Sequence, residues 1–415
     1  MEQYSFAKSY QMFNEAKKMI PNGIYGPRSP YFLTYGSYPC FFTKGKGSHV
    51  WDVDGNEYID YMCSFGTNIL GMCNPEVDEA AMDQMGKGNS FTLPTDKWNK
   101  LAEVMVGLID GTDWVAYGKN GSDVTTYATA IARHHTKRNK IVVVKGAYNG
   151  AHSWCSNSSA GVPDEYSAHI LSFEYNNIDQ FKVLIDENKD DIAGVMLTPH
   201  HHPAMEDQVM PKDGFYKELE DICNKDGILI IMDDIRCGFR IHNNGSHCYY
   251  GSHPDLICLG KAMANGYPIS AIMGKNSNKA AAEGVYFTGT HFFAAVPMAA
   301  AITTMKIIER DHVIKDIYAL GTRLEQGIKS QAEELGLDIH YTGHPVMPFM
   351  RFEGDTDLSL NRFFCGEAAK RGIFLHPHHN WFICAAHTKE DIERTLEVTR
   401  QCFALTAEEM AKKGG

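Results

Sequence analysis

Four short segments carry residues whose types and order could do chemistry together. They are a glycine-rich turn with Gly121 and Ser122, a tyrosine between glycines at Tyr148, an acid pair led by Asp233, and Lys261 directly after a glycine. A glycine-rich turn before a helix offers N–H groups to a phosphate, and an aromatic ring can stack on a flat ligand. A buried carboxylate requires a cationic partner, and a desolvated lysine amine becomes a nucleophile.

Each feature alone also has a structural explanation. The turn can be a capped helix start with Ser122 as the cap, Tyr148 can be a packing residue, and Lys261 can be exposed. The acids Asp233 and Asp234 can form salt bridges with Arg236 and Arg240. Together, and in this chain order, the four features are the parts required to hold pyridoxal phosphate.

The elements that must position these residues follow from periodicity. Between about residues 114 and 270, short apolar runs alternate with helix-period segments; the runs are "IVVVKGAY", "IAGVMLTP", "ILIIMDDI" and "LICLGK". This alternation predicts an α/β fold with parallel strands covered on both faces. Ligands of such sheets bind beyond the carboxyl ends of the strands, which is where the four segments lie. The helix after Gly121 should bury Val124, Tyr127, Ala128 and Ile131.

The two ends of the chain differ from this pattern. Residues 32–62 contain short strand-like runs and an Asp54-Gly55-Asn56 turn, which predicts an antiparallel hairpin. Near the C-terminus, Ile317, Leu320, Leu324 and Ile328 share one helical face, and the helix should stop at Gly336. The predicted organisation is a large domain over 63–310 and a small α+β domain built from 1–62 and 311–415.

Composition narrows the kind of partner. The 415 residues carry a formal net charge of −12, which argues against binding to nucleic acid or to an anionic membrane. No apolar run approaches the roughly 20 residues that span a bilayer. The 11 cysteines include no C-x-x-C pair, and the N-terminus lacks the apolar stretch of a signal peptide. We expect a cytoplasmic protein with a small-molecule substrate.

Nearly the whole chain resembles the class III aminotransferases of fold type I, in the branch near glutamate-1-semialdehyde 2,1-aminomutase. The segments "GILIIMDDIRCGFR" and "PDLICLGKAMANGYPISA" carry most of the resemblance. It implies a mostly parallel seven-stranded sheet in the large domain and pyridoxal 5'-phosphate as cofactor. It also implies that Asp233 binds the pyridine nitrogen and that Lys261 forms the Schiff base.

The resemblance assigns further cofactor contacts. Gly121 and Ser122 correspond to phosphate ligands, and Tyr148 and Ile235 to residues on the two faces of the ring. Thr290, with Thr288 as the second choice, corresponds to a threonine that completes the phosphate site of the partner subunit. A homodimer with a shared active site is therefore expected.

Substrate residues are expected in other segments. Arg28 in "GPRSP" corresponds to an arginine that binds the substrate carboxylate, and Phe65 to a pocket aromatic. His378 and His379 are candidates for donors that line the pocket. Clusters of adjacent histidines, here and at 200–202, rarely converge on one ion, so we predict no metal site.

Two departures from the family bear on the substrate. Thr198 stands where many members have a glutamate that pairs with a mobile arginine, and "LHPHHNWF" contains no such arginine. We therefore do not expect glutamate to be the usual donor. The expected reaction is amino transfer between an amino acid or amine and an oxo acid or aldehyde. The alternative is an aminomutase, or an amino-acid racemase or epimerase, that uses the same cofactor.

Overall fold

The computed structural model describes residues 3–414, which form two compact units. The larger unit contains residues 75–203 and 209–314. The smaller unit contains the residues before 75, residues 204–208 and the residues after 314, so it joins both ends of the chain. These compact units are defined by contacts, so the domain boundaries predicted at residues 62 and 310 remain a prediction.

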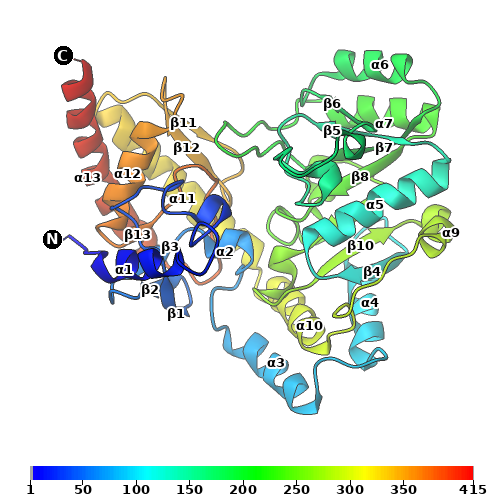
Figure 1. Cartoon of the computed structure of the whole chain (residues 1–415), viewed down its shortest axis with the longest axis horizontal. Coiled ribbons are helices and arrows are strands. Elements are labelled where there is room, and N and C mark those ends of the chain that lie inside the picture. The colour runs from blue at the N-terminus through cyan, green and yellow to red at the C-terminus, as the bar shows by residue number, and fades with distance from the viewer. Residues whose placement is uncertain (1–2, 415) are drawn as a thin grey trace. The chain divides into compact units, whose positions relative to one another are not determined.

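A seven-stranded sheet forms the centre of the larger unit (Figure 1). Its strand order is β4-β10-β9-β8-β7-β5-β6, and only β10 runs antiparallel to its neighbours. The strands are β4 (Trp114–Gly118), β5 (Lys140–Val144), β6 (Ile170–Phe173), β7 (Ile192–Leu197), β8 (Leu229–Asp233), β9 (Leu256–Leu259) and β10 (Ser270–Gly274). The predicted α/β class and the mostly parallel sheet are confirmed.

Helices cover both faces of this sheet. The β4-α5-β5 connection crosses the sheet in the opposite direction from β7-α7-β8, so right-handed crossovers place α5 and α7 on opposite faces. The helices are α3 (Pro75–Lys87), α4 (Asp96–Leu108), α5 (Gly121–Thr136), α6 (Ile178–Glu187), α7 (Phe215–Asp226), α8 (Ser246–Tyr250), α9 (Asn276–Gly284) and α10 (Ala295–Arg310). Short 3₁₀ turns occupy Ser153–Cys155, Asp164–Tyr166 and Lys261–Ala264.

Burial on both faces explains the apolar runs in the sequence. All six residues of β7 are buried, and Ile231 of β8 packs in one core cluster with residues of α5. The helix face predicted for α5 is confirmed, because Val124, Tyr127, Ala128 and Ile131 are all buried.

The smaller unit has two small sheets. Strands β1 (Phe42–Lys46), β2 (His49–Asp52) and β3 (Glu57–Asp60) form an antiparallel meander, and β13 (Ile373–Phe374) adds to β3 in parallel. The predicted hairpin turn lies between β2 and β3, where the Asp52 carboxylate accepts hydrogen bonds from the N–H groups of Asp54 and Asn56. Strands β11 (Ile339–Thr342) and β12 (Phe349–Phe352) pair separately.

Helices complete the smaller unit: α1 (Ala7–Ala16), the 3₁₀ turn Gly26–Arg28, α2 (Cys63–Gly66), α11 (Val313–Glu334), α12 (Ser359–Ala369) and α13 (Lys389–Gly414). The predicted face of α11 is buried at Ile317, Leu324 and Ile328, whereas Leu320 is partly exposed. Gly336 ends this segment with a left-handed φ of 65°, as predicted.

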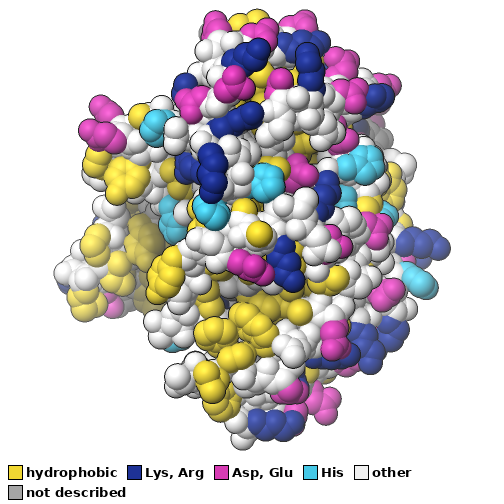
Figure 2. All heavy atoms as spheres, turned by 90° about the vertical axis from the view of Figure 1, so that its right-hand side faces the viewer, with side chains coloured by type: hydrophobic (Ala, Val, Ile, Leu, Met, Phe, Trp, Pro, Cys, Tyr) yellow, Lys and Arg dark blue, Asp and Glu magenta, His cyan; other side chains and the backbone are white. Residues whose placement is uncertain are grey.

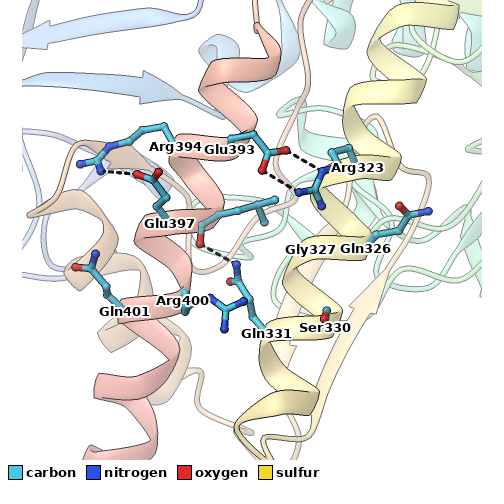
Figure 3. A pocket seen from close by; sticks show the side chains of 11 residues that line it. Arg323, Gln326, Gly327, Ser330, Gln331, Glu393, Arg394, Glu397, Arg400 and Gln401 are labelled. Carbon is cyan, nitrogen blue, oxygen red and sulfur yellow. Dashed lines mark hydrogen bonds and ion pairs between the residues drawn. The ribbon is translucent and has the colours of Figure 1, made fainter.

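A groove runs between α11 and α13 (Figure 3). Its arginines are paired with carboxylates: Arg323 with Glu393, Arg394 with Glu397, and Arg400 with Glu334. These ion pairs are exposed and contribute little to stability. Because the charges are matched within the unit, we interpret the groove as a solvated surface.

In the described part of the chain, no helix has the length and apolar character that a membrane crossing requires.

Candidate active site

The N-terminus of α5 follows the end of β4 after two residues. Asn120 is the N-cap, and the Asp123 carboxylate accepts hydrogen bonds from the N–H groups of Lys119 and Asn120 at 2.9 and 2.7 Å. The prediction that Ser122 caps the helix is therefore wrong: Asn120 and Asp123 form a capping box, which leaves Ser122 in the first turn.

Ser122 instead joins α5 to the loop after β5. Its Oγ accepts a hydrogen bond from the Ala151 N–H at 2.9 Å. Gly150 lies directly against it, because a Cβ at this position would stand 2.7 Å from Ser122 Oγ, and its φ of 133° also favours glycine. The helix start and the glycine loop thus approach each other closely, as a cradle for a phosphate requires.

Asp233 ends β8 with its side chain buried. Its carboxylate accepts hydrogen bonds from Asn149 Nδ2 at 2.8 Å and from the Ile235 N–H at 3.3 Å. Burial raises the pKa of Asp233, while these hydrogen bonds and the nearby Lys261 lower it. Asn149 was not predicted from the sequence; its position between Tyr148 and Gly150 was the one available signal. It holds the orientation of the carboxylate.

Lys261 follows the end of β9, the strand next to β8. Its backbone is left-handed, with φ of 43°, which is uncommon for a residue with a Cβ. Burial, assisted by the charge of Arg236, lowers the pKa of Lys261 to about 7. A neutral amine is therefore available near neutral pH, as a nucleophile requires.

Ile235 lies between the two halves of this site. A Cβ on Gly121 would meet Ile235 Cγ2 at 3.2 Å, and a Cβ on Gly260 would meet Ile235 Cδ1 at 3.2 Å. The side chain therefore fills the space between the start of α5 and the residue before Lys261. Tyr148 has 46% of its surface exposed, so its ring is accessible for stacking.

The other charged residues of the acid segment have structural contacts. Asp234 Oδ2 accepts a hydrogen bond from the Ser246 N–H at 2.9 Å, and burial raises the pKa of Asp234 to about 7. Arg236 is buried, and its Nη1 donates to the His202 carbonyl at 3.0 Å. Asp234 is thus held by a backbone contact.

Lys119 and Thr290 lie in loops of the same unit. Lys119 Nζ donates to the Pro268 carbonyl at 3.2 Å, and burial lowers its pKa to about 8. Thr290 and Thr288 are exposed in the segment between α9 and α10. Exposure is what a contact with a second subunit would require.

The predicted substrate residues belong to the smaller unit, where three of them form one cluster. The Arg28 guanidinium stands 4.4 Å from the centre of the Phe65 ring, and His379 makes an edge contact with the same ring at 5.1 Å. His378 is buried and packs edge-on against Phe32. The residues predicted to bind the cofactor and this cluster thus belong to different compact units.

The first histidine group serves the packing of the larger unit. His200 Nδ1 is 3.0 Å from the Tyr250 hydroxyl, and the His201 ring stacks on Tyr175. His202 is buried, and burial keeps its pKa well below the usual value, so this imidazole is neutral.

The residues of the larger unit fit pyridoxal phosphate. A helix N-terminus with glycine at its first position suits the phosphate, and a buried carboxylate held by two N–H donors suits a ring cation. The Lys261 amine is at the end of the strand beside that carboxylate. Fold and site together define a fold-type I pyridoxal-phosphate enzyme.

Comparison with known proteins specifies the family. The model for aminotransferase class III matches residues 33–398. The aminopentol aminotransferase of Sphingopyxis macrogoltabida is 38% identical over 95% of this chain and 94% of the relative. The 3-aminobutyryl-CoA aminotransferase of Cloacimonas acidaminovorans is 37% identical over 97% of this chain and 98% of the relative. Glutamate-1-semialdehyde 2,1-aminomutases also match. The one from Bacillus subtilis is 33% identical over 96% of this chain and 98% of the relative.

Solved structures agree with this result. The FumI protein of a Sphingopyxis species, in its pyridoxal-phosphate internal aldimine form, superposes with a TM-score of 0.95 and 37% identity, over 98% of both chains. The chain belongs to the class III aminotransferases and is a pyridoxal-phosphate-dependent transaminase. The resemblance and the cofactor expected from the sequence are confirmed.

The contact between Gly150 and Ser122 predicts a steric effect on the phosphate cradle. Gly150→Ala should weaken binding of pyridoxal phosphate by about tenfold or more, because the added Cβ would push Ser122 out of place. A cost of about 1.4 kcal/mol in binding free energy corresponds to a tenfold loss of affinity. Gly161→Ala is the matched control, because Gly161 also has a left-handed φ, of 73°, but has no atom within 4 Å of its added Cβ. Equal affinities of the two variants, measured by cofactor titration, would contradict the prediction.

The lowered pKa of Lys261 predicts the pH dependence of cofactor capture. The rate at which the apoprotein takes up pyridoxal phosphate should rise with pH through about 7, where the amine loses its proton. An amine with the ordinary lysine pKa would be less than about 0.1% neutral at that pH. Stopped-flow absorbance measures this rate; a rise centred near pH 10 would show that burial does not perturb the amine.

Proposed function

We propose that Lys261 and Asp233 are the catalytic residues of this transaminase. The supporting observation is their placement: a lysine with a pKa of about 7 and a buried carboxylate at the ends of neighbouring parallel strands. Gly121, Ser122, Tyr148 and Ile235 are proposed as the cofactor-binding residues around them. Asn149 is proposed as the residue that positions Asp233.

In the proposed mechanism, Lys261 acts twice. Its neutral Nζ would hold the cofactor, and the same amine would take the proton from the substrate carbon that bears the amino group. Bound pyridoxal phosphate supplies an electron sink for this step. Asp233 keeps the ring nitrogen protonated, because a buried carboxylate favours a cation beside it. Asn149 and the Ile235 N–H hold that carboxylate in place.

The donor is proposed to be an amine or amino acid other than glutamate. Thr198 is buried, and its Oγ1 donates to the His200 carbonyl at 2.8 Å, so this position offers no carboxylate to an arginine gate. The relatives named for an aminopentol and for 3-aminobutyryl-CoA are consistent with donors of other kinds. Arg28, Phe65, His378 and His379 are proposed to contact the substrate, with Arg28 binding a carboxylate where one is present.

An aminomutase, racemase or epimerase is the alternative reaction on the same residues. Six glutamate-1-semialdehyde 2,1-aminomutases match with 30–33% identity, below the 37–38% of two aminotransferases. A mutase or racemase turns over without an added oxo acid. A transaminase requires an added oxo acid for repeated turnover.

Lys261→Ala should lower turnover by at least about 10²–10⁴-fold, because both cofactor attachment and proton transfer are lost. Lys279→Ala, at an exposed lysine of α9, is the control and should retain activity. The assay supplies a panel of amines and amino acids with one oxo acid, and follows the cofactor spectrum in parallel. Retained turnover of Lys261→Ala would end the assignment, and turnover of the unaltered protein without oxo acid would favour the alternative.

We further propose a cytoplasmic homodimer in which Thr290 completes the phosphate site of the partner subunit. All 11 cysteines are free, which fits a reducing compartment. The larger unit exposes large apolar side chains, among them Met82, Met85, Leu93 and Tyr286, and hydrophobic side chains gather at the surface in Figure 2. Such exposure is typical of a subunit interface.

Mixed dimers test the shared site. A dimer of one Lys261→Ala chain and one Thr290→Ala chain contains one intact site if Thr290 acts across the interface, because the two defects then fall in the same site. Its activity at limiting cofactor should reach about half that of the unaltered dimer. If Thr290 acted within its own chain, both sites would be defective, and the mixed dimer would be no better than the average of the two parent variants.

A further inference from the structure

Three buried side chains with metal-ligand chemistry meet in the smaller unit, outside the proposed cofactor site. Cys63 follows β3, and Cys384 and His387 precede α13 with the spacing C-x-x-H. One ligand atom from each residue lies within 4.8 Å of the other two. Ligand atoms of a tetrahedral zinc ion stand roughly 3.5–3.8 Å apart, so small side-chain rotations would bring all three to one ion.

The His387 ring lies beside the Cys384 thiol. Its Nδ1 accepts a hydrogen bond from the Cys384 N–H at 3.0 Å, which requires a lone pair on that nitrogen. The same Nδ1 is 3.2 Å from Cys384 Sγ, so binding of an ion there would exchange this hydrogen bond for a bond to the metal. The His387 ring stacks on the Tyr61 ring with the two ring centres 4.7 Å apart, and this contact fixes the plane of the imidazole. Nε2 then carries the proton, and it is buried without a hydrogen-bond partner among residues 3–414.

Charge balance selects the kind of ion. Two thiolates and one neutral imidazole carry a charge of −2, and a divalent cation brings the buried group to neutrality, which reduces the cost of burying it. Sulfur and imidazole ligands suit zinc, whereas magnesium and calcium prefer oxygen.

We propose that Cys63, Cys384 and His387 form a structural site for a thiophilic divalent cation, with Zn²⁺ as the ion of best fit. Binding exchanges the thiol protons for the ion, and no electron transfer is involved.

A bound ion would link residues 61–69 to residues 382–387, two segments that are already hydrogen-bonded to each other. Phe382 N–H donates to the Tyr61 carbonyl at 2.7 Å, and Ala385 N–H donates to the Ile69 carbonyl at 2.8 Å. Between them, Cys63, Ser64 and Phe65 are three consecutive left-handed residues, a conformation that costs free energy unless its surroundings hold it. The cation would therefore hold the turn that presents Phe65 to Arg28.

Metal content of the holoenzyme tests the proposal. Protein purified with a reductant, incubated with Zn²⁺ and desalted should contain about one zinc per chain by mass spectrometry of the elements. Cys384→Ser and Cys63→Ser should each lose most of it. Cys365→Ser is the matched control, since it also replaces a buried thiol of the smaller unit and should keep the zinc. Zinc retained equally by all variants would overturn the assignment.

A second measurement on the unaltered protein avoids the risk that a variant misfolds. Titration with Co²⁺ should produce visible d–d bands of a tetrahedral site, at wavelengths beyond the cofactor absorbance, which saturate near one equivalent and vanish on addition of Zn²⁺. Absence of both bound zinc and these bands would refute the site. Recovery of a Cys63–Cys384 disulfide from protein purified without reductant, with no zinc uptake after reduction, would refute it as well.

Discussion

Burial of the Asp233 carboxylate is the constraint on which the larger unit depends. A charge at the end of a strand in the middle of a sheet is stable only if donors and a cation surround it. Asn149 and the Ile235 N–H supply the donors, and each comes from a loop that follows a different strand of the sheet. Because parallel strands end at one edge, the residues that this carboxylate requires are brought together there. At the same edge, Lys261 follows the end of the adjacent strand β9.

The reversed strand β10 relates this edge to the start of α5. β10 pairs with β4 and β9, so it spans the distance between the glycine turn and Lys261. Ser270 at its beginning donates from Oγ to the Asn120 carbonyl at 2.8 Å, which fixes the N-cap residue of α5. The start of α5 and the end of β9, which precedes Lys261, are thus joined through β10.

Much of this arrangement could be predicted from the sequence, because continuous apolar runs reveal buried parallel strands and the residues proposed to bind the cofactor follow their ends. The contacts that were missed join segments with no shared periodicity. Asn149 carries no pattern that distinguishes it from a loop amide, and the capping box at Asn120 was obscured by the equally suitable Ser122. The meeting of Cys63 with Cys384 and His387 could not be predicted either, because it depends on how the two ends of the chain pair in the smaller unit.

The separation of residues between the two compact units has an evolutionary consequence. Every residue proposed to bind the cofactor belongs to the larger unit, whereas Arg28, Phe65, His378 and His379 belong to the smaller one. Substitutions that alter the choice of amine can therefore accumulate in one core without disturbing the packing that positions the lysine and the carboxylate in the other. A chain built in this way can acquire new donors while keeping one chemistry, which is the condition under which a family diversifies in substrate rather than in reaction.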